Sequence, residues 1–192
     1  ASARPARALG LGIAYIPQDR HGEGLATDLT VEENVPLPHL IERGRAWLTG
    51  RKWQREAAAQ VIEDYDVHPA DPVAVVANMS GGNQQKVLMG KWMLGGPSLL
   101  VLDDPTQAVD VGARAAVLRA TRQAAVDGAA VILCSSEVED LAAVCDRVAI
   151  LENGRVAREI AQPFTADELL AATFSEAPEA SNATAETDGE DR

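Results

Sequence analysis

The sequence predicts an α/β protein with a mostly parallel sheet that also carries a helical block. Short apolar segments alternate with helical patterns after residue 98, as in chains that build a parallel sheet. The apolar run at residues 99–102 ends in two adjacent carboxylates, Asp103 and Asp104, at the strand end where α/β sheets bind ligands. A length of 192 residues makes one domain the default and gives it a core large enough to fold.

Local signals predict the order of the elements. Residues 30–33 match a capping box at a helix start, and Asn153 followed by Gly154 predicts a tight hairpin turn. We expect strands at 12–16, 99–102, 129–134, 147–151 and 155–160, and helices from 30, at 51–64, 83–94, 113–126, 137–144 and 165–174. We expect residues 1–174 to form one domain with a helical subdomain at about 30–95, and residues 175–192 to be a disordered acidic tail.

Composition excludes several classes of protein. The net charge of −12 lacks the basic surface that a general nucleic-acid binder needs. No apolar run is long enough to cross a membrane. Cys134 and Cys145 lie in apolar surroundings without metal-ligand spacing, which favours buried, reduced thiols over a disulfide. The three histidines are scattered, so a histidine metal site is not expected.

Two motifs are suited to phosphate chemistry. Gly81 and Gly82 allow close approach of an anion, and the helix expected to start near Asn83 would direct free N–H groups toward it. Of Asp103 and Asp104, one could hold Mg²⁺ and the other could orient a water molecule. Taken alone, the glycines could form an ordinary turn before a helix, and Asp103 could merely end a strand. Their occurrence in order along one chain favours the phosphate-binding interpretation.

These motifs together resemble the nucleotide-binding domain of ABC transporters. Within that family the sequences of the motifs are most similar to those of the second cassette of sugar-import ATPases of the ribose, galactose and xylose type. The resemblance covers about residues 4–174 and rests on residues 81–86, 91–92, 103–106, 109–112 and 134–137. It implies a P-loop NTPase-like fold, ATP and Mg²⁺ as cofactors, and a peripheral position at the cytoplasmic face of the cell membrane. It also implies a membrane permease and a companion cassette as partners, with dimerisation across the ATP sites, and no nucleic acid.

The resemblance implies catalytic and metal-binding roles for four residues. Gln18 falls at the Q-loop glutamine, which contacts Mg²⁺ and the attacking water, although a surface glutamine could simply be solvated. Asp103 corresponds to the Walker B carboxylate that holds Mg²⁺. Asp104 occupies the place of the catalytic glutamate, and Ser136 that of the switch histidine.

The resemblance also implies a nucleotide-binding set at the signature motif. Ser80, Gly81 and Gly82, with Asn83 beside them, would bind the γ-phosphate of an ATP molecule held by the opposing cassette. Asp110 lies in the D-loop, which crosses to the opposite site.

The chain departs from the family pattern in two ways. No Gly-x-x-x-x-Gly-Lys-Ser/Thr segment is present, so the sequence predicts an incomplete cassette that binds ATP poorly alone. Without the phosphate-loop strand, the strands at 129–134 and 147–151 would have unpaired edges. Asp104 is one methylene shorter than glutamate and Ser136 cannot act as an imidazole, so hydrolysis at this cassette is expected to be slow.

The leading functional expectation is an ATP-binding component that couples ATP binding and hydrolysis to sugar import through a permease. The alternative is a non-catalytic or regulatory remnant that only binds a partner ATPase. A third reading, the C-terminal lobe of an SMC-like ATPase, is disfavoured because the chain is acidic and no heptad pattern precedes the signature.

Overall fold

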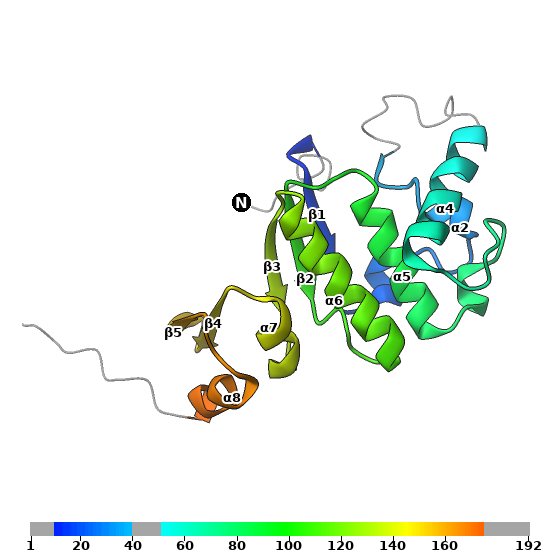
Figure 1. Cartoon of the computed structure of the whole chain (residues 1–192). Coiled ribbons are helices and arrows are strands. Elements are labelled where there is room, and N and C mark those ends of the chain that lie inside the picture. The colour runs from blue at the N-terminus through cyan, green and yellow to red at the C-terminus, as the bar shows by residue number, and fades with distance from the viewer. Residues whose placement is uncertain (1–9, 40–50, 175–192) are drawn as a thin grey trace, which may run out of the picture. The chain divides into compact units, whose positions relative to one another are not determined.

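The computed structural model describes residues 10–39 and 51–174, which fall within two compact units, residues 1–145 and 146–192 (Figure 1). The predicted acidic tail at 175–192 lies outside the described residues. The division into a domain at 1–174 and a helical subdomain at about 30–95 stays a prediction. Within the described residues, no helix is both long and apolar enough to span a bilayer.

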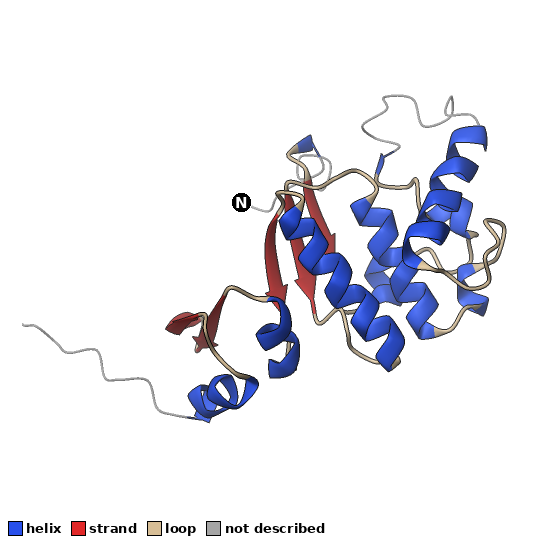
Figure 2. Cartoon of the chain, viewed as in Figure 1, coloured by secondary structure: helices blue, strands red, loops and turns tan. Residues whose placement is uncertain are grey.

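The first unit contains a three-stranded parallel sheet, which confirms the predicted α/β class (Figure 2). Its strands are β1 (Ile13–Ile16), β2 (Leu99–Asp103) and β3 (Ala130–Cys134), in the order β1-β2-β3. β2 pairs with both neighbours. The carboxyl ends of all three strands therefore meet at one edge of the sheet.

The two faces of this sheet differ in burial. Ile16, Leu100 and Leu102 are fully buried on one face, where α5 (Gly81–Met93) contacts β1 and α6 (Val111–Val126) contacts β3. Figure 1 shows these two helices side by side next to the sheet. On the other face, Tyr15 is 42% exposed and Ile132 is 51% exposed. We call the first the covered face and the second the open face.

Five further helices are described in the first unit. They are η1 (Arg20–Gly24), α2 (Val31–Asn34), α4 (Arg51–Tyr65), η2 (Val76–Asn78) and α7 (Val138–Val144). The predicted capping box is present: the Glu33 carboxylate accepts a hydrogen bond from the backbone N–H of Thr30 at 2.9 Å. α4 approaches α5 closely at Gly90, where an added Cβ would lie 2.2 Å from a methyl carbon of Val61.

Two details of the sequence prediction are wrong. Cys134 is exposed, because it lies on the open face of an edge strand, and Cys145 is only partly buried. The other side chains of β3 alternate between partly buried and exposed in the same way, and Ile132 is exposed. The helix expected to begin near Asn83 begins at Gly81, because Ser80 provides the N-cap.

The second unit is an antiparallel hairpin with one helix. β4 (Arg147–Glu152) pairs with β5 (Arg155–Ala161), and α8 (Ala166–Phe174) follows. Asn153 and Gly154 have φ angles of 50° and 76°, which confirms the predicted turn. Among the residues of this unit that the structure describes, Val148 of β4 and Leu169 of α8 are the buried apolar ones.

Candidate functional site

Three of the predicted catalytic residues meet at the carboxyl edge of the sheet. Gln18 follows β1, Asp104 follows β2 and Ser136 follows β3. The Asp104 carboxylate accepts hydrogen bonds on Oδ1 from the backbone N–H of Ser136 at 2.8 Å and from its Oγ at 3.2 Å. Its other oxygen, Oδ2, accepts from Nε2 of Gln18 at 3.5 Å. The parallel topology explains this convergence, because it brings the ends of sequence-distant strands together.

The backbone at Asp104 directs its side chain toward these partners. Its φ angle of 41° lies in the left-handed region, which aspartate tolerates better than most residues. The N–H of Asp104 donates to the carbonyl oxygen of Cys134 at 2.9 Å, so the turn is fastened to the end of β3.

Asp103 lies beside this group and is partly buried. Tyr15 donates a hydrogen bond from its hydroxyl to Asp103 Oδ2 at 3.3 Å. Burial and the charge of Asp103 raise the pKa of Tyr15. Partial desolvation of the thiol and the two nearby carboxylates likewise raise the pKa of Cys134, although much of its side chain is exposed. Sequence reasoning missed Tyr15, although strand alternation places it on the same face as Asp103.

The residues of the signature motif form a second group at the start of α5. Ser80 is exposed and accepts hydrogen bonds on Oγ from the backbone N–H of Asn83 at 3.4 Å and from its Nδ2 at 2.9 Å. Asn83 Oδ1 accepts from the N–H of His68 at 2.7 Å. The first N–H groups of a helix lack intrahelical acceptors, so this end can bind an anion.

Asp110 belongs to the signature group. It caps α6 by accepting a hydrogen bond on Oδ1 from the N–H of Ala113 at 2.9 Å. A Cβ added to Gly82 would lie 2.5 Å from Asp110 Oδ2 and 2.9 Å from the Cβ of Ala113, so a larger residue here would displace these neighbours. A Cβ added to Gly81 would lie 2.8 Å from Nη2 of Arg20.

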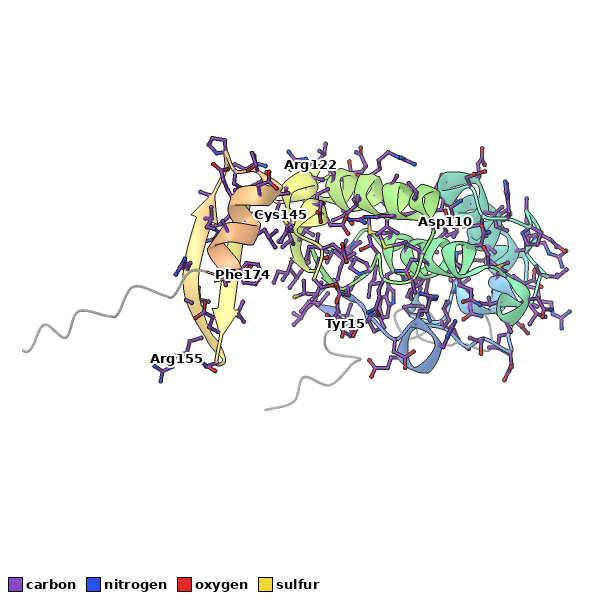
Figure 3. The ribbon with its side chains drawn as sticks, turned by 90° about the horizontal axis from the view of Figure 1, so that it is seen from below. Tyr15, Asp110, Arg122, Cys145, Arg155 and Phe174 are labelled. Atoms are coloured by element: carbon purple, nitrogen blue, oxygen red, sulfur yellow. The ribbon has the colours of Figure 1, made fainter. Side chains whose placement is uncertain are left out.

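The predicted site residues therefore fall into a carboxylate group (Gln18, Asp103, Asp104 and Ser136) and a signature group (Ser80, Gly81, Gly82, Asn83 and Asp110). Figure 3 shows Tyr15, beside the carboxylate group, well apart from Asp110. Arg20 lies between them: its Nη1 donates to the carbonyl oxygen of Gln107 at 3.3 Å, while Nη2 lies beside Gly81. An open groove of about 690 Å³ between α4, α5 and α6 reaches Asn83 and Asp110 but none of the carboxylate group.

A buried network holds the loop that follows Asp104. Asp140 of α7 is 1% exposed and accepts from Thr106 Oγ1 at 2.6 Å and from Arg114 Nε at 2.7 Å. The hydrogen bond to Asp140 raises the pKa of Arg114. Asp140 was missed in the sequence because its partners are 34 and 26 residues away.

The metal-binding capacity of the carboxylate group is limited. Among the described residues, no three histidine, cysteine, aspartate or glutamate side chains gather to hold a metal ion. Asp103 and Asp104 do offer carboxylate oxygens, and Gln18 an amide oxygen, at one edge. This set fits Mg²⁺, which is bound in many sites by one or two carboxylates together with substrate phosphates.

Comparison with known proteins decides the family. The ABC transporter family profile matches residues 2–107, more than half of the chain. The chain belongs to the ABC transporter family. The matched region includes Gln18, the signature residues 80–83 and both strand-end carboxylates, whereas Asp110 and Ser136 lie beyond it.

Sugar-import proteins are among the relatives of this ABC chain. It is 38% identical over 175 residues to a putative ribose/galactose/methyl galactoside import ATP-binding protein of Agrobacterium fabrum, covering 91% of this chain and 35% of the relative. It is 39% identical over 169 residues to a ribose import ATP-binding protein of Streptomyces avermitilis, covering 88% of this chain and 32% of the relative. The chain thus spans about a third of the length of these relatives.

Solved ABC structures support the fold. A dimeric ATP-binding cassette in a post-hydrolysis state bound to ADP and Pi is 25% identical, with a TM-score of 0.66, covering 79% of this chain and 64% of that chain. A second dimeric bacterial ABC transporter cassette, 24% identical with a TM-score of 0.64, shows the same fold over 78% of this chain and 63% of that chain.

Proposed function

We propose that this chain is an ATP-binding component of an ABC-type carbohydrate importer, and that it forms an incomplete cassette which supplies the signature, Walker B and D-loop residues. The convergence of Gln18, Asp104 and Ser136 beside Asp103 at one sheet edge carries this proposal. If Gln18 and Ser136 were merely solvated surface side chains, they would have no reason to donate hydrogen bonds to the same carboxylate, that of Asp104. The names of the relatives favour ribose or galactose-type sugars as the transported class.

In this proposal, Asp103 would hold Mg²⁺ together with nucleotide phosphates, and the ion would supply charge stabilisation to those phosphates. Gln18 and Asp104 orient the attacking water between them. Tyr15 fixes the rotamer of Asp103 by its hydrogen bond. Asp110 and residues 80–83 face the ATP of a companion cassette, and a membrane permease docks on the pair. The dimeric state of both solved cassettes supports the companion.

Hydrolysis at the carboxylate group is proposed to be slow. Asp104 Oδ1 is engaged by two donors of Ser136, so this short side chain is drawn toward β3. Displacement of a catalytic group by about 1 Å can lower a rate by about 10²-fold. The intact signature group would then serve the companion's ATP more than this cassette's own.

The open face and the free edge of β3 support the incompleteness of the cassette. Tyr15 of β1 and Ile132 of β3 leave apolar surface exposed on the open face, and within the described residues β3 pairs only with β2. Such an edge can accept a further strand. We propose that a complementing segment with the phosphate-binding loop covers this region, since the 192 residues contain no Walker A motif.

The test combines this chain with the phosphate-loop portion of the Agrobacterium fabrum relative and measures Mg²⁺-dependent ATP hydrolysis. We expect Asp103→Asn to abolish hydrolysis and Asp104→Glu to raise it by about tenfold or more. The control is Asp28→Asn, because Asp28 is an exposed loop carboxylate outside both groups. Failure of the wild-type mixture to bind or hydrolyse ATP would refute the proposal.

The alternative function, a non-catalytic remnant that binds a partner ATPase, is favoured by the absence of a Walker A motif. It predicts that the chain associates with a partner cassette and that Asp103→Asn changes neither association nor the partner's activity. The same variant therefore separates the two functions.

A further inference from the structure

The segment that follows Gln18 is a compact turn with its own hydrogen bonds. Asp19 Oδ1 accepts from the N–H groups of His21 at 3.1 Å and Gly22 at 2.9 Å. The N–H of Leu25 donates to the carbonyl oxygen of Arg20 at 2.8 Å. These bonds join residues 19–25 into one compact unit, and Gln18 immediately precedes it. We call residues 19–25 the Gln18 segment.

One face of α5 contacts the Gln18 segment through hydrogen bonds and packing. Lys91 donates from Nζ to the carbonyl oxygen of Gly24 at 2.7 Å, and both residues are buried. Gln84 Oε1 and His21 Nε2 are hydrogen-bonded at 2.7 Å. Leu88 fills the space beside Gly24, where an added Cβ would lie 2.9 Å from its methyl carbon. Gln84, Leu88 and Lys91 share one face because four and then three residues separate them.

A contribution to stability alone does not explain why a lysine occupies this buried position. Lys91 is 7% exposed, and the partner of its ammonium group is the neutral carbonyl of Gly24. Among the residues that the structure describes, no carboxylate forms an ion pair with it within 4.0 Å. Burying an ammonium group without an opposite charge is unfavourable, and an apolar side chain would pack there at lower cost. What the ammonium provides is a directed bond to Gly24, six residues beyond Gln18.

We propose that Lys91 is a positioning residue for Gln18: by fixing the Gln18 segment to α5, it sets how closely the Gln18 amide approaches Asp104. The hydrogen bond between His21 and Gln84 is a second contact that holds the Gln18 segment to α5. The inference rests on the proposed ATPase function only for its catalytic consequence. A shift of α5 would therefore carry Gln18 with it and change the 3.5 Å contact between the Gln18 amide and Asp104.

The first arm of the test uses the full chain without nucleotide. Lys91→Met removes the donor but keeps an unbranched chain, whereas Lys91→Arg keeps a donor. In Lys91→Met we expect amide hydrogen exchange at Glu23 and Leu25 to rise by about tenfold or more, and the NMR signal of the Gln18 side-chain amide to shift. Lys91→Arg should retain the wild-type signals. Lys86→Met is the matched control, because Lys86 lies on the same helix but bonds to the carbonyl oxygen of Asp66.

The second arm measures ATP hydrolysis in the complemented cassette. We expect Lys91→Met to lower kcat by about 10-fold to 10²-fold with little change in KM, because Gln18 orients water and does not hold the nucleotide. Lys91→Arg should restore kcat. If Lys91→Met does not fold, His21→Leu is used instead, because His21 is exposed and its loss removes the second contact to α5. The hydrogen-exchange and kcat measurements are then repeated with this variant.

The outcomes separate the two proposals. Unchanged exchange and an unchanged Gln18 signal in folded Lys91→Met overturn the positioning role whatever the hydrolysis result. Altered Gln18 signals with unchanged kcat in an active wild-type complex also overturn it, while the proposed function stands. An inactive wild-type complex refutes the proposed function, and the first arm still decides whether Lys91 positions Gln18.

Discussion

The two faces of the parallel sheet are built from the same strands but have different physical roles. On the covered face, Leu100 and Leu102 are fully buried by helices. On the open face, Tyr15 and Ile132 keep about half of their surface in contact with solvent. The covered face therefore supplies the folding free energy of the first unit, whereas the open face is available to another polypeptide.

The same division separates the candidate residues. Asp103 lies on the open face with Tyr15, and the carboxylate group continues along the edge of the sheet. The signature group begins α5, whose other residues form the core on the covered side. A cassette that shares its sites with other segments would be organised in this way, with rigid packing behind the site and accessible surface in front of it.

The largest expected effect comes from the covered face. Leu100→Ala removes a fully buried side chain from the central strand and should lower the free energy of unfolding by about 2–5 kcal/mol. Val101→Ala is the matched control, because Val101 is the next residue of the strand and lies on the open face, partly buried. Urea unfolding followed by circular dichroism measures both. Equal losses would show that the two faces are packed alike.

A smaller, pH-dependent effect is expected at Lys91. Burial lowers its pKa to about 8 from an ordinary value of 10.5. Between these values the unfolded chain binds a proton that the native protein does not, so stability rises with pH in this window. The rise cannot exceed about 3 kcal/mol, and below pH 8 both states are protonated.

The measurement at Lys91 is the difference between the wild type and Lys91→Met in the free energy of unfolding, followed as a function of pH. The pKa of Tyr65 is raised to about 12 by burial, so its ionisation in the unfolded chain lowers stability above about pH 10. Subtracting the curve of Lys91→Met from that of the wild type removes this contribution. A difference that stays flat from pH 8 to 10 would show that the Lys91 ammonium is solvated.

Local signals were sufficient to predict most elements. The capping box at Thr30, the hairpin turn at Asn153 and the strand that ends in Asp103 each depend on residues close in sequence, and the structure confirms all three. The grouping of Gln18, Asp104 and Ser136 was accessible only through the family resemblance. Spacing alone does not say which strands are neighbours.

The contacts that sequence reasoning missed are tertiary. Tyr15 with Asp103, Arg114 with Asp140 and Lys91 with Gly24 join residues 26 to 88 positions apart. Cys134 was wrongly expected to be buried because an apolar parallel strand is usually covered on both faces. Here β3 is an edge strand with one open face, and no local pattern distinguishes that case.

The smallest expected effect on stability is on the open face. Ile132→Thr keeps the branched Cβ that favours a strand and should change the free energy of unfolding by less than about 0.5 kcal/mol, because half of Ile132 is already exposed. The same change should weaken binding of the complementing segment and reduce self-association, both measurable by sedimentation velocity. Leu133→Thr, directed toward the core from the same strand, is the control and should destabilise the unit clearly. If Ile132→Thr destabilised the chain as much as Leu133→Thr, the open face would belong to the core. Its exposure could then no longer support a missing half of the cassette.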